Sequence, residues 1–289
     1  MLRGTSGRTV LLKTALLIAG LVMTSGVAVA AADGKYPDLR GQWTGVLRSR
    51  PGIPGQASFD PGKPGGKGQE APLTAEYQAI WEADLKRLEQ GGLVDWRGPS
   101  CLGFGMPQIA YGFQPMEFII TPETTYVLVN WVEHTRRIFT DGRDWPAEIE
   151  PTLTGYSIGQ WIDANHDGHY DVLEVESRGF KGPRYYDADG LPLHHDNQSV
   201  FKERFYLDRA DKNILHDDIT IIDHALTRPW TVTRDLRRNP NPRPLWREFV
   251  CAEGNAWVRI GEETYFFGSG GQLMPMLKGQ APPDLRYFK

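Results

Sequence analysis

Residues 163–174 carry the spacing of a calcium-binding loop. In the run DANHDGHYDVLE, oxygen-bearing side chains stand at the first, third and fifth positions, a glycine at the sixth and a glutamate at the twelfth. Ca²⁺ prefers hard oxygen ligands, and this alternation directs several of them to one point while the glycine permits a sharp turn. The predicted ligands are Asp163, Asn165, Asp167, the carbonyl of His169, Asp171 and Glu174.

The segments on either side of this loop are typical of strands rather than helices. Apolar and polar residues alternate over 156–162 and 172–176, as in the two strands of a hairpin. We therefore expect the loop at a hairpin tip. In an EF-hand, the helix that follows the loop brings the twelfth residue back to the ion. On a strand this does not hold, so Asp171 is a better ligand than Glu174, and the role is structural because the loop carries no activated nucleophile. The alternative is a polar turn in which Asp, Asn and Gly only provide turn geometry.

A second set of residues has the types needed for acid–base chemistry without a cofactor. Histidine has an unperturbed pKa close to neutral pH, which makes His195 the candidate proton-transfer group, with Arg137 and Asp141 as a polar anchor. Arg136 and Arg137 are adjacent, and neighbouring side chains on a strand face opposite sides. One of the two is therefore expected to point inward and pair with a carboxylate, the candidates being Glu117, Glu203 and Glu248. Structural pairing is the alternative to a ligand anchor.

Other histidines are of the right type for a transition metal. His194, His195, His216 and His224 each lie near aspartates, but their spacing matches no known ligand signature, and solvated loop histidines are the simpler interpretation. The sequence contains no HExxH, GxGxxG or GxxxxGK[ST] motif, so no nucleotide cofactor is expected. Residues 155–159 match G-x-S-x-G in letters, but a hairpin strand is the wrong setting for a nucleophile elbow.

The composition is that of an ordinary globular chain. Its 289 residues include 32 basic and 36 acidic side chains, and the net charge of −4 argues against a nucleic-acid partner. The 32 glycines and 21 prolines predict a turn-rich fold. The aromatic content of nine Trp, 11 Tyr and 12 Phe would suit a barrel that holds a small hydrophobic or aromatic molecule.

The first 30 residues have the pattern of a secretory signal peptide. Arg3, Arg8 and Lys13 precede a mostly apolar run over 15–29, and residues 28–30 fit a small-residue cleavage site. Removal of these three cations would take the net charge from −4 to −7. An uncleaved anchor is the alternative, but no later segment is apolar enough to span a membrane. We therefore expect a periplasmic or secreted protein without a transmembrane span after cleavage.

The only two cysteines are expected to form a disulfide. Cys101 and Cys251 are an isolated pair, and an oxidising compartment favours their bonding. Such a bond would tie an early segment to a late one, which predicts a single folding unit over residues 31–289. Two buried free thiols are the alternative.

The hydrophobic pattern predicts a mainly β fold, an antiparallel barrel or sandwich of which a calycin-like barrel is one form. One amphipathic helix is expected near the N-terminus over 74–91, capped by Thr74, with Tyr77, Ile80, Trp81, Leu85 and Leu88 on one face. Residues 31–72 form a strand near 42–48 followed by a long Gly/Pro-rich loop, and 73–289 form the β-rich body. The predicted strands of that body are 118–121, 125–132, 136–140, 156–162, 171–176, 200–207, 214–222, 230–234 and 257–260.

Three motifs together resemble a family of exported, uncharacterised bacterial proteins. They are Glu117–Pro122 (EFIxTP), Arg136–Arg143 (RRIxTDGR) and Gly155–Trp161 (GxSIGxW), and the likeness extends over residues 73–253. The resemblance implies no activity. Family members have a short W-x-G-D-T turn where this chain has the calcium-type loop, which implies that the loop is a local addition. His195 is similar to a histidine in the family's G-x-P-H-S segment.

Two functions of different class follow from these patterns. The first is an exported protein with a cavity for a hydrophobic small molecule, acting by cofactor-free acid–base chemistry of the isomerase, lyase or hydrolase type. The second is a non-catalytic binding or envelope protein with a structural calcium hairpin. A pocket that holds a histidine–carboxylate pair would favour the enzyme, whereas a filled barrel would favour the binding protein.

Overall fold

The computed structural model describes residues 34–46, 71–91, 103–111, 114–130, 134–182, 185, 191–248, 250 and 256–286. These residues all belong to one compact unit, Ala32–Lys289. The predicted signal peptide, residues 49–70 of the Gly/Pro-rich loop, Cys101 and Cys251 lie outside the described residues.

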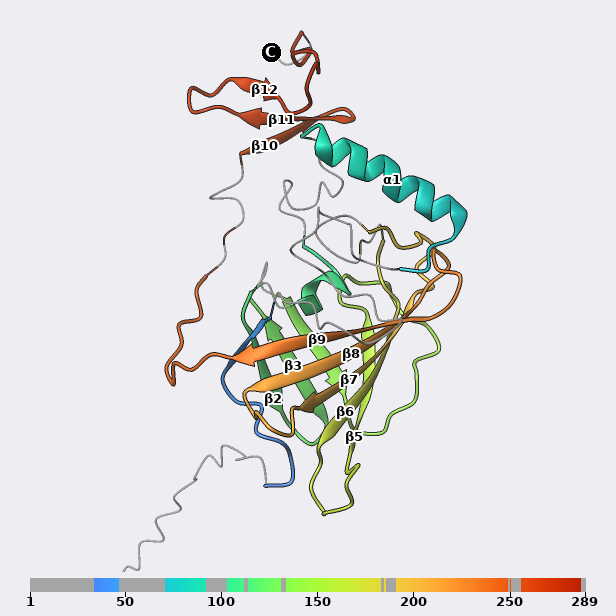
Figure 1. Ribbon diagram of the computed structural model, residues 1–289, viewed down its shortest axis with the longest axis vertical. Helices are drawn as coiled ribbons and strands as arrows, with labels where there is room; N and C mark the ends of the chain where they lie inside the picture. The colour runs from blue at the N-terminus through green and yellow to red at the C-terminus, as the bar shows by residue number, and fades with distance from the viewer. Residues whose placement is uncertain are drawn as a thin grey trace, which may run out of the picture. The chain divides into compact units, whose positions relative to one another are not determined.

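Nine strands close into a barrel in chain order, from β1 through to β9, and β9 pairs back onto β1 (Figure 1). A separate three-stranded sheet follows near the C-terminus. The barrel strands are β1 (Gln42–Gly45), β2 (Met116–Ile120), β3 (Thr124–Val129), β4 (His134–Phe139), β5 (Tyr156–Ile162), β6 (Val172–Arg178), β7 (Val200–Leu207), β8 (Ile214–Ile222) and β9 (Trp230–Arg238). The small sheet consists of β10 (Trp257–Ile260), β11 (Glu263–Phe267) and β12 (Leu273–Pro275).

The predicted barrel is confirmed, with one departure from an antiparallel arrangement. Strands β4 and β5 run parallel, and their register covers only Ile138 opposite Ser157 and Phe139 opposite Ile158. A parallel pair needs a connection that carries the chain back along the barrel, and residues 140–155 provide it. The sequence pattern also missed β11 and β12, of which β12 has only three residues.

Alternate residues of the barrel strands fill the interior. On β8, Leu215, Ile219 and Ile221 are fully buried, and Trp230 and Leu236 of β9 are buried beside them. The short 3₁₀ helix η1 (Gln108–Tyr111) adds buried Ile109, and a space of only about 10 Å³ remains where this residue meets the inner wall. That volume holds about one water molecule, so the barrel is packed here rather than hollow.

Helix α1 (Ala75–Glu89) forms where the sequence predicted it. The Thr74 hydroxyl accepts the Tyr77 N–H at 3.4 Å, as an N-cap does, and Trp81 and Leu85 join the same apolar core cluster as the barrel residues. Ile80 does not share this face, since it is 41% exposed. The helix is too short to cross a bilayer, and no described helix is both long and apolar enough to do so.

Replacing Trp81 by alanine should therefore lower the free energy of unfolding by about 3 to 5 kcal/mol, because it leaves a cavity under the helix. Ile80→Ala, one residue away on the exposed side, should change it by less than about 0.5 kcal/mol. Urea unfolding followed by tryptophan-independent circular dichroism would measure both. Equal losses would mean that the helix does not pack through Trp81.

Candidate functional site

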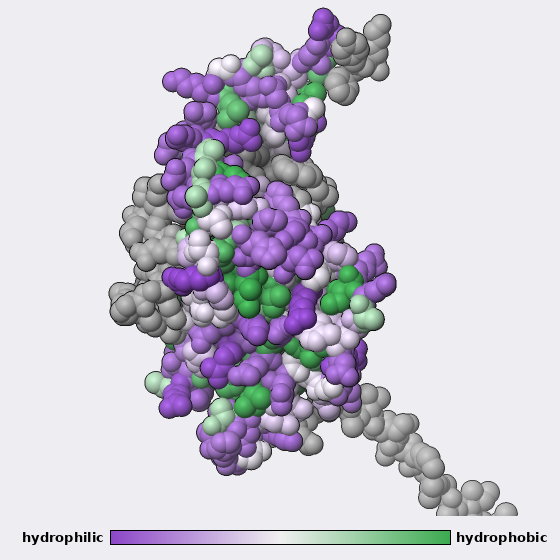
Figure 2. All heavy atoms as spheres, turned by 90° about the vertical axis from the view of Figure 1, so that its right-hand side faces the viewer, coloured by the Kyte–Doolittle hydropathy of each residue, from purple (hydrophilic) through white to green (hydrophobic). Residues whose placement is uncertain are grey.

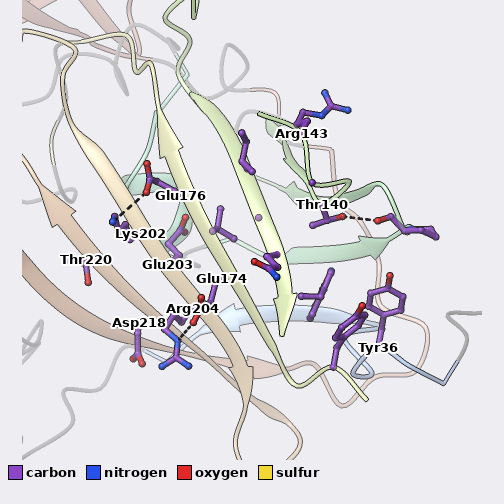
Figure 3. Close-up of a pocket in the computed structure, with 18 of the residues that line it drawn as sticks. Tyr36, Thr140, Arg143, Glu174, Glu176, Lys202, Glu203, Arg204, Asp218 and Thr220 are labelled. Carbon is purple, nitrogen blue, oxygen red and sulfur yellow. Dashed lines mark hydrogen bonds and ion pairs between the residues drawn. The ribbon is translucent and has the colours of Figure 1, made fainter. Parts of the chain in front are cut away.

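A groove of about 1030 Å³ lies on the outer wall of the barrel (Figure 3). Its floor consists of outward-facing side chains on β5 to β9 that stand directly opposite one another in the strand register. One row runs across these strands through Ile158, Glu176, Lys202, Thr220 and Thr231. The next row contains Gln160, Glu174, Arg204 and Asp218.

Polar groups are paired along both of these rows, which together form the ladder of the groove floor. Glu176 lies 3.5 Å from the ammonium of Lys202, and Glu174 accepts a hydrogen bond from Arg204 at 3.1 Å. In the first row, the hydroxyls of Thr220 and Thr231 are 2.8 Å apart. The groove floor therefore offers donors and acceptors while its opposite charges compensate one another.

One end of the groove is aromatic. The ring of Tyr36 lies 5.4 Å from that of Trp161 and 5.2 Å from that of Tyr170, centroid to centroid. The Trp161 indole N–H donates to the Thr125 hydroxyl at 3.1 Å, which fixes the ring. Apolar ring faces here adjoin the polar ladder, as in sites for molecules with one apolar and one polar side.

The barrel interior holds a second polar group of residues. Arg136 is 3% exposed and forms a two-pronged ion pair with Glu203, while its guanidinium also donates to Ser177 at 2.8 Å and to Ser157 at 3.3 Å. The prediction that one of two adjacent arginines points inward is thus confirmed, with Glu203 as its partner. Arg137, the arginine chosen from sequence as the anchor, is the one that faces solvent.

Asp217 is a further charged group in this interior, and the sequence analysis missed it. It is 1% exposed, and neither of its carboxylate oxygens accepts a hydrogen bond from a described residue. Burial, followed by the negative charge of Glu203, raises the pKa of Asp217 well above its usual range, while the cations Arg234 and Arg136 oppose the rise. Asp217 lies an even number of residues from Leu215, Ile219 and Ile221 on β8. This spacing could have predicted from sequence that it faces the barrel interior.

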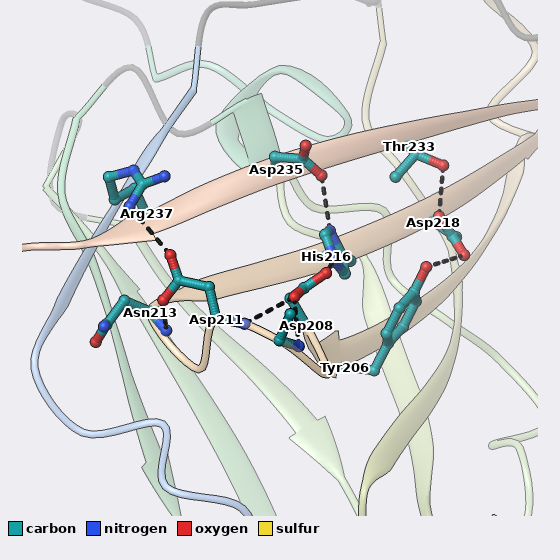
Figure 4. Close-up of polar contacts among 10 residues, drawn as sticks. Tyr206, Asp208, Asp211, Asn213, His216, Asp218, Thr233, Asp235 and Arg237 are labelled. Atoms are coloured by element: carbon teal, nitrogen blue, oxygen red, sulfur yellow. Dashed lines mark hydrogen bonds and ion pairs between the residues drawn. The ribbon is translucent and has the colours of Figure 1, made fainter. Parts of the chain in front are cut away.

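On the outer face of the same strand, His216 is locked between two carboxylates (Figure 4). Its Nδ1 lies 2.7 Å from Asp235 and its Nε2 3.0 Å from Asp208. Backbone N–H donation from Asp211 and the contact with His216 lower the pKa of Asp208 to about 2. Because both ring nitrogens are engaged, this histidine ties β8 to β9 and to the β7–β8 turn rather than presenting a free base.

The three residues predicted for acid–base chemistry do not form one site. Arg137 faces outward on β4, and His195 is exposed in the segment before β7. Asp141 binds the guanidinium of Arg143 at 2.9 Å, and this partner lowers the pKa of Asp141 to about 2, which leaves it ionised at neutral pH. No described contact joins these residues, so the geometry gives His195 no anchored partner for proton transfer.

The calcium-type loop lies at the tip of the β5–β6 hairpin, as predicted. Asp163 accepts the N–H groups of Asp167 at 3.1 Å and Gly168 at 2.9 Å, and Asp171 accepts that of Ala164 at 2.8 Å. The first and ninth residues of the motif thus turn toward the loop. Glu174 does not, because it lies on β6 and pairs with Arg204. The remaining expected ligands, Asn165, Asp167 and His169, are exposed within the loop.

Of the four histidines considered for a transition metal, the structure brings two together. His194 and His224 meet at Asp196, whereas His195 and His216 stay outside this cluster. The sequence offered no spacing that would select this pair, because the histidines come from different loops.

We predict that Ca²⁺ stabilises the hairpin loop. At a concentration one hundred times its dissociation constant, Ca²⁺ should raise the free energy of unfolding by about 2.7 kcal/mol. Asp163→Ala should abolish this gain, whereas Glu174→Ala should retain it because Glu174 pairs with Arg204. Calorimetric unfolding with Ca²⁺ and with chelator measures the difference, and a gain that survives Asp163→Ala would reduce the motif to a turn.

We also predict that Asp217 makes stability depend on pH. Since folding raises its pKa, the folded protein binds more protons than the unfolded chain at pH values above about 3.9, so the free energy of unfolding falls as pH rises through the folded pKa. Asp217→Asn should remove this fall. Exposed Asp144→Asn is the control, and urea unfolding between about pH 4 and pH 8 is the measurement. An unchanged slope in Asp217→Asn would contradict the assignment.

No protein-family model matches this chain, and no curated protein matches it. The resemblance to exported bacterial proteins therefore stays a prediction from the motifs in residues 73–253.

Proposed function

We propose that this protein is a non-catalytic binding protein that holds a neutral small molecule, apolar on one side and polar on the other, in the groove on its outer wall. The observation that carries the proposal is the juxtaposition of the aromatic end (Tyr36, Trp161 and Tyr170) with the ladder of paired charges. The packed interior beside η1, with about 10 Å³ of space, gives little support to a ligand inside the barrel at that place.

The charge balance of the groove favours an uncharged ligand. Its ionised side chains alternate in sign along the strand register, so Glu174 and Arg204 neutralise each other, as do Glu176 and Lys202. An anion would have to break one of these pairs to gain a partner, and the carboxylate left outside them, Asp218, already accepts the hydroxyls of Tyr206 and Thr233. Hydroxyl groups of a ligand can bind to the outer lone pairs and N–H groups of intact pairs. The face of the protein drawn in Figure 2 has apolar patches set among hydrophilic residues.

The calcium-type loop supports the aromatic end directly. Tyr170 is the eighth residue of the loop, and its N–H donates to the carbonyl of Lys35 at 2.7 Å, next to Tyr36. His169 Nδ1 lies 2.9 Å from the carbonyl of Gly34. An ion that orders the loop would thereby hold two of the three rings in place. Export, inferred from residues 1–30, would bring the protein to compartments rich in Ca²⁺.

The test uses p-nitrophenyl β-D-glucoside as a neutral probe with one aromatic and one hydroxylated end, and benzoate and benzylamine as charged probes. Calorimetric titration should show that the glucoside binds more tightly than either ion. Tyr170→Ala should weaken its binding about fivefold, the equivalent of about 1 kcal/mol of aromatic contact. Phe267→Ala, an exposed aromatic outside the groove lining, is the control.

A second pair of variants tests whether affinity for the glucoside depends on the ladder or on surface charge in general. Arg204→Gln breaks the pair with Glu174 in the groove, whereas Arg237→Gln breaks the pair with Asp211 on another part of the surface. Only the first should alter affinity for the glucoside. If all three probes bind equally, or if both arginine variants behave alike, the groove is not a site for a neutral ligand.

A further inference from the structure

We propose that His194, Asp196 and His224 form a binding site for a divalent transition-metal ion of the zinc class. One ligand atom from each of the three side chains lies within 4.8 Å of the other two. Among the described residues, this is the one group of histidine, cysteine and carboxylate side chains that meets this distance. The site is separate from the outer groove, whose lining contains none of the three residues.

A buried carboxylate holds the two segments of this site together. Asp223, 8% exposed at the end of β8, accepts the backbone N–H of His194 at 2.9 Å and that of Ala225 at 2.8 Å. It also accepts the hydroxyl of Ser199. The segment that carries His194 and Asp196 is therefore fixed against the turn that carries His224. Metal sites commonly have hydrogen-bonding groups of this kind, which hold the ligands in position.

Helix α1 supports the same segment from another direction. The ring of Tyr77 lies 5.5 Å from that of His194, and the backbone of His195 hydrogen-bonds to the Tyr77 hydroxyl. The His194 and His224 rings meet edge to face at 5.6 Å. Three elements, the helix, the loop before β7 and the β8–β9 turn, thus converge on one point.

In this cluster, two imidazole nitrogens approach the same carboxylate oxygen. Asp196 Oδ2 lies 3.1 Å from His194 Nδ1 and in still closer contact with His224 Nδ1. The Asp196 backbone N–H also points at His194 Nδ1, at 3.2 Å, which requires a lone pair on that nitrogen. The same lone pair can bind a metal ion, which would then replace this N–H at Nδ1. A divalent ion placed among the three side chains would also neutralise the Asp196 carboxylate that the two imidazoles approach.

The donor set selects the kind of metal. Two imidazole nitrogens and one carboxylate oxygen suit Zn²⁺ and similar ions, whereas Ca²⁺ takes oxygen ligands and belongs to the hairpin loop. With metal–ligand bonds of about 2.0 to 2.1 Å, ligand atoms in a tetrahedral site stand about 3.3 Å apart. The 3.1 Å between Asp196 Oδ2 and His194 Nδ1 is close to this spacing, whereas His224 Nδ1 would have to move away from its closer contact with Asp196. The His224 side chain is 68% exposed, so ions have access. Three protein ligands leave one position for water.

The test is a titration of the chelator-treated protein with Zn²⁺ by calorimetry, in excess Ca²⁺ to keep the hairpin loop occupied. We expect one Zn²⁺ per chain, and a tetrahedral visible spectrum when Co²⁺ replaces it. His224→Ala and Asp196→Asn should each weaken Zn²⁺ binding at least tenfold. His195→Ala, an exposed neighbour outside the cluster, should leave it unchanged. Circular dichroism confirms that each variant is folded.

Several results would overturn the proposal. These are no Zn²⁺ binding by the wild-type protein, binding that survives both His224→Ala and Asp196→Asn, and equal loss in His195→Ala. A thermal readout provides a second test that needs no affinity measurement. Saturating Zn²⁺ should raise the melting temperature of the wild-type protein and of His195→Ala but not that of His224→Ala. A rise in all three would place the ion elsewhere.

Discussion

The ion pair between Arg136 and Glu203 is the interaction on which the barrel depends most. Both side chains are almost fully buried, and they join β4 to β7 across the interior, with Ser157 of β5 and Ser177 of β6 as further partners. Removing one member of a buried pair costs about 3 to 5 kcal/mol, because the other charge is left without compensation. The pair therefore stabilises only those strand registers that bring all four side chains to one place.

The same register determines what the outer wall offers. Side chains of a strand alternate between two faces, so the placement of Glu203 inside puts Lys202 and Arg204 outside. There they meet Glu176 and Glu174, their direct neighbours on β6. A slip of one residue on β7 would bury two cations and expose Glu203. The charged floor of the groove and the charged centre of the barrel are thus two consequences of a single alignment.

Much of this fold could be predicted from sequence where the alternation was regular. The bounds of β5, β7, β8 and β10 match the predicted ranges residue for residue. In β5 and β7, buried positions alternate with less buried ones along most of the strand, which is the pattern that the sequence showed. The parallel pairing of β4 with β5 could not be predicted, since the choice of partner depends on how residues 140–155 return. For Arg136 and Arg137 the sequence showed that the two would face opposite ways. Ile138 is buried and lies two residues from Arg136, so it shares a strand face with Arg136. The apolar Ile138 therefore indicates that Arg136 is the arginine that faces inward.

The candidate sites were harder to predict because loops have no periodicity. His194 and His195 are adjacent and chemically identical, and the hydrogen bond from the His194 backbone to Asp223, with the Tyr77 ring against His194, fixes which of them meets His224. Likewise, Glu174 fits the calcium motif in letters, but its strand assigns it to Arg204. In both cases the strand, or a carboxylate at its end, determines which partner a side chain meets. Binding groups of this protein are therefore expected where loops are fastened to the barrel by buried or paired carboxylates, and less so where a motif merely continues in sequence.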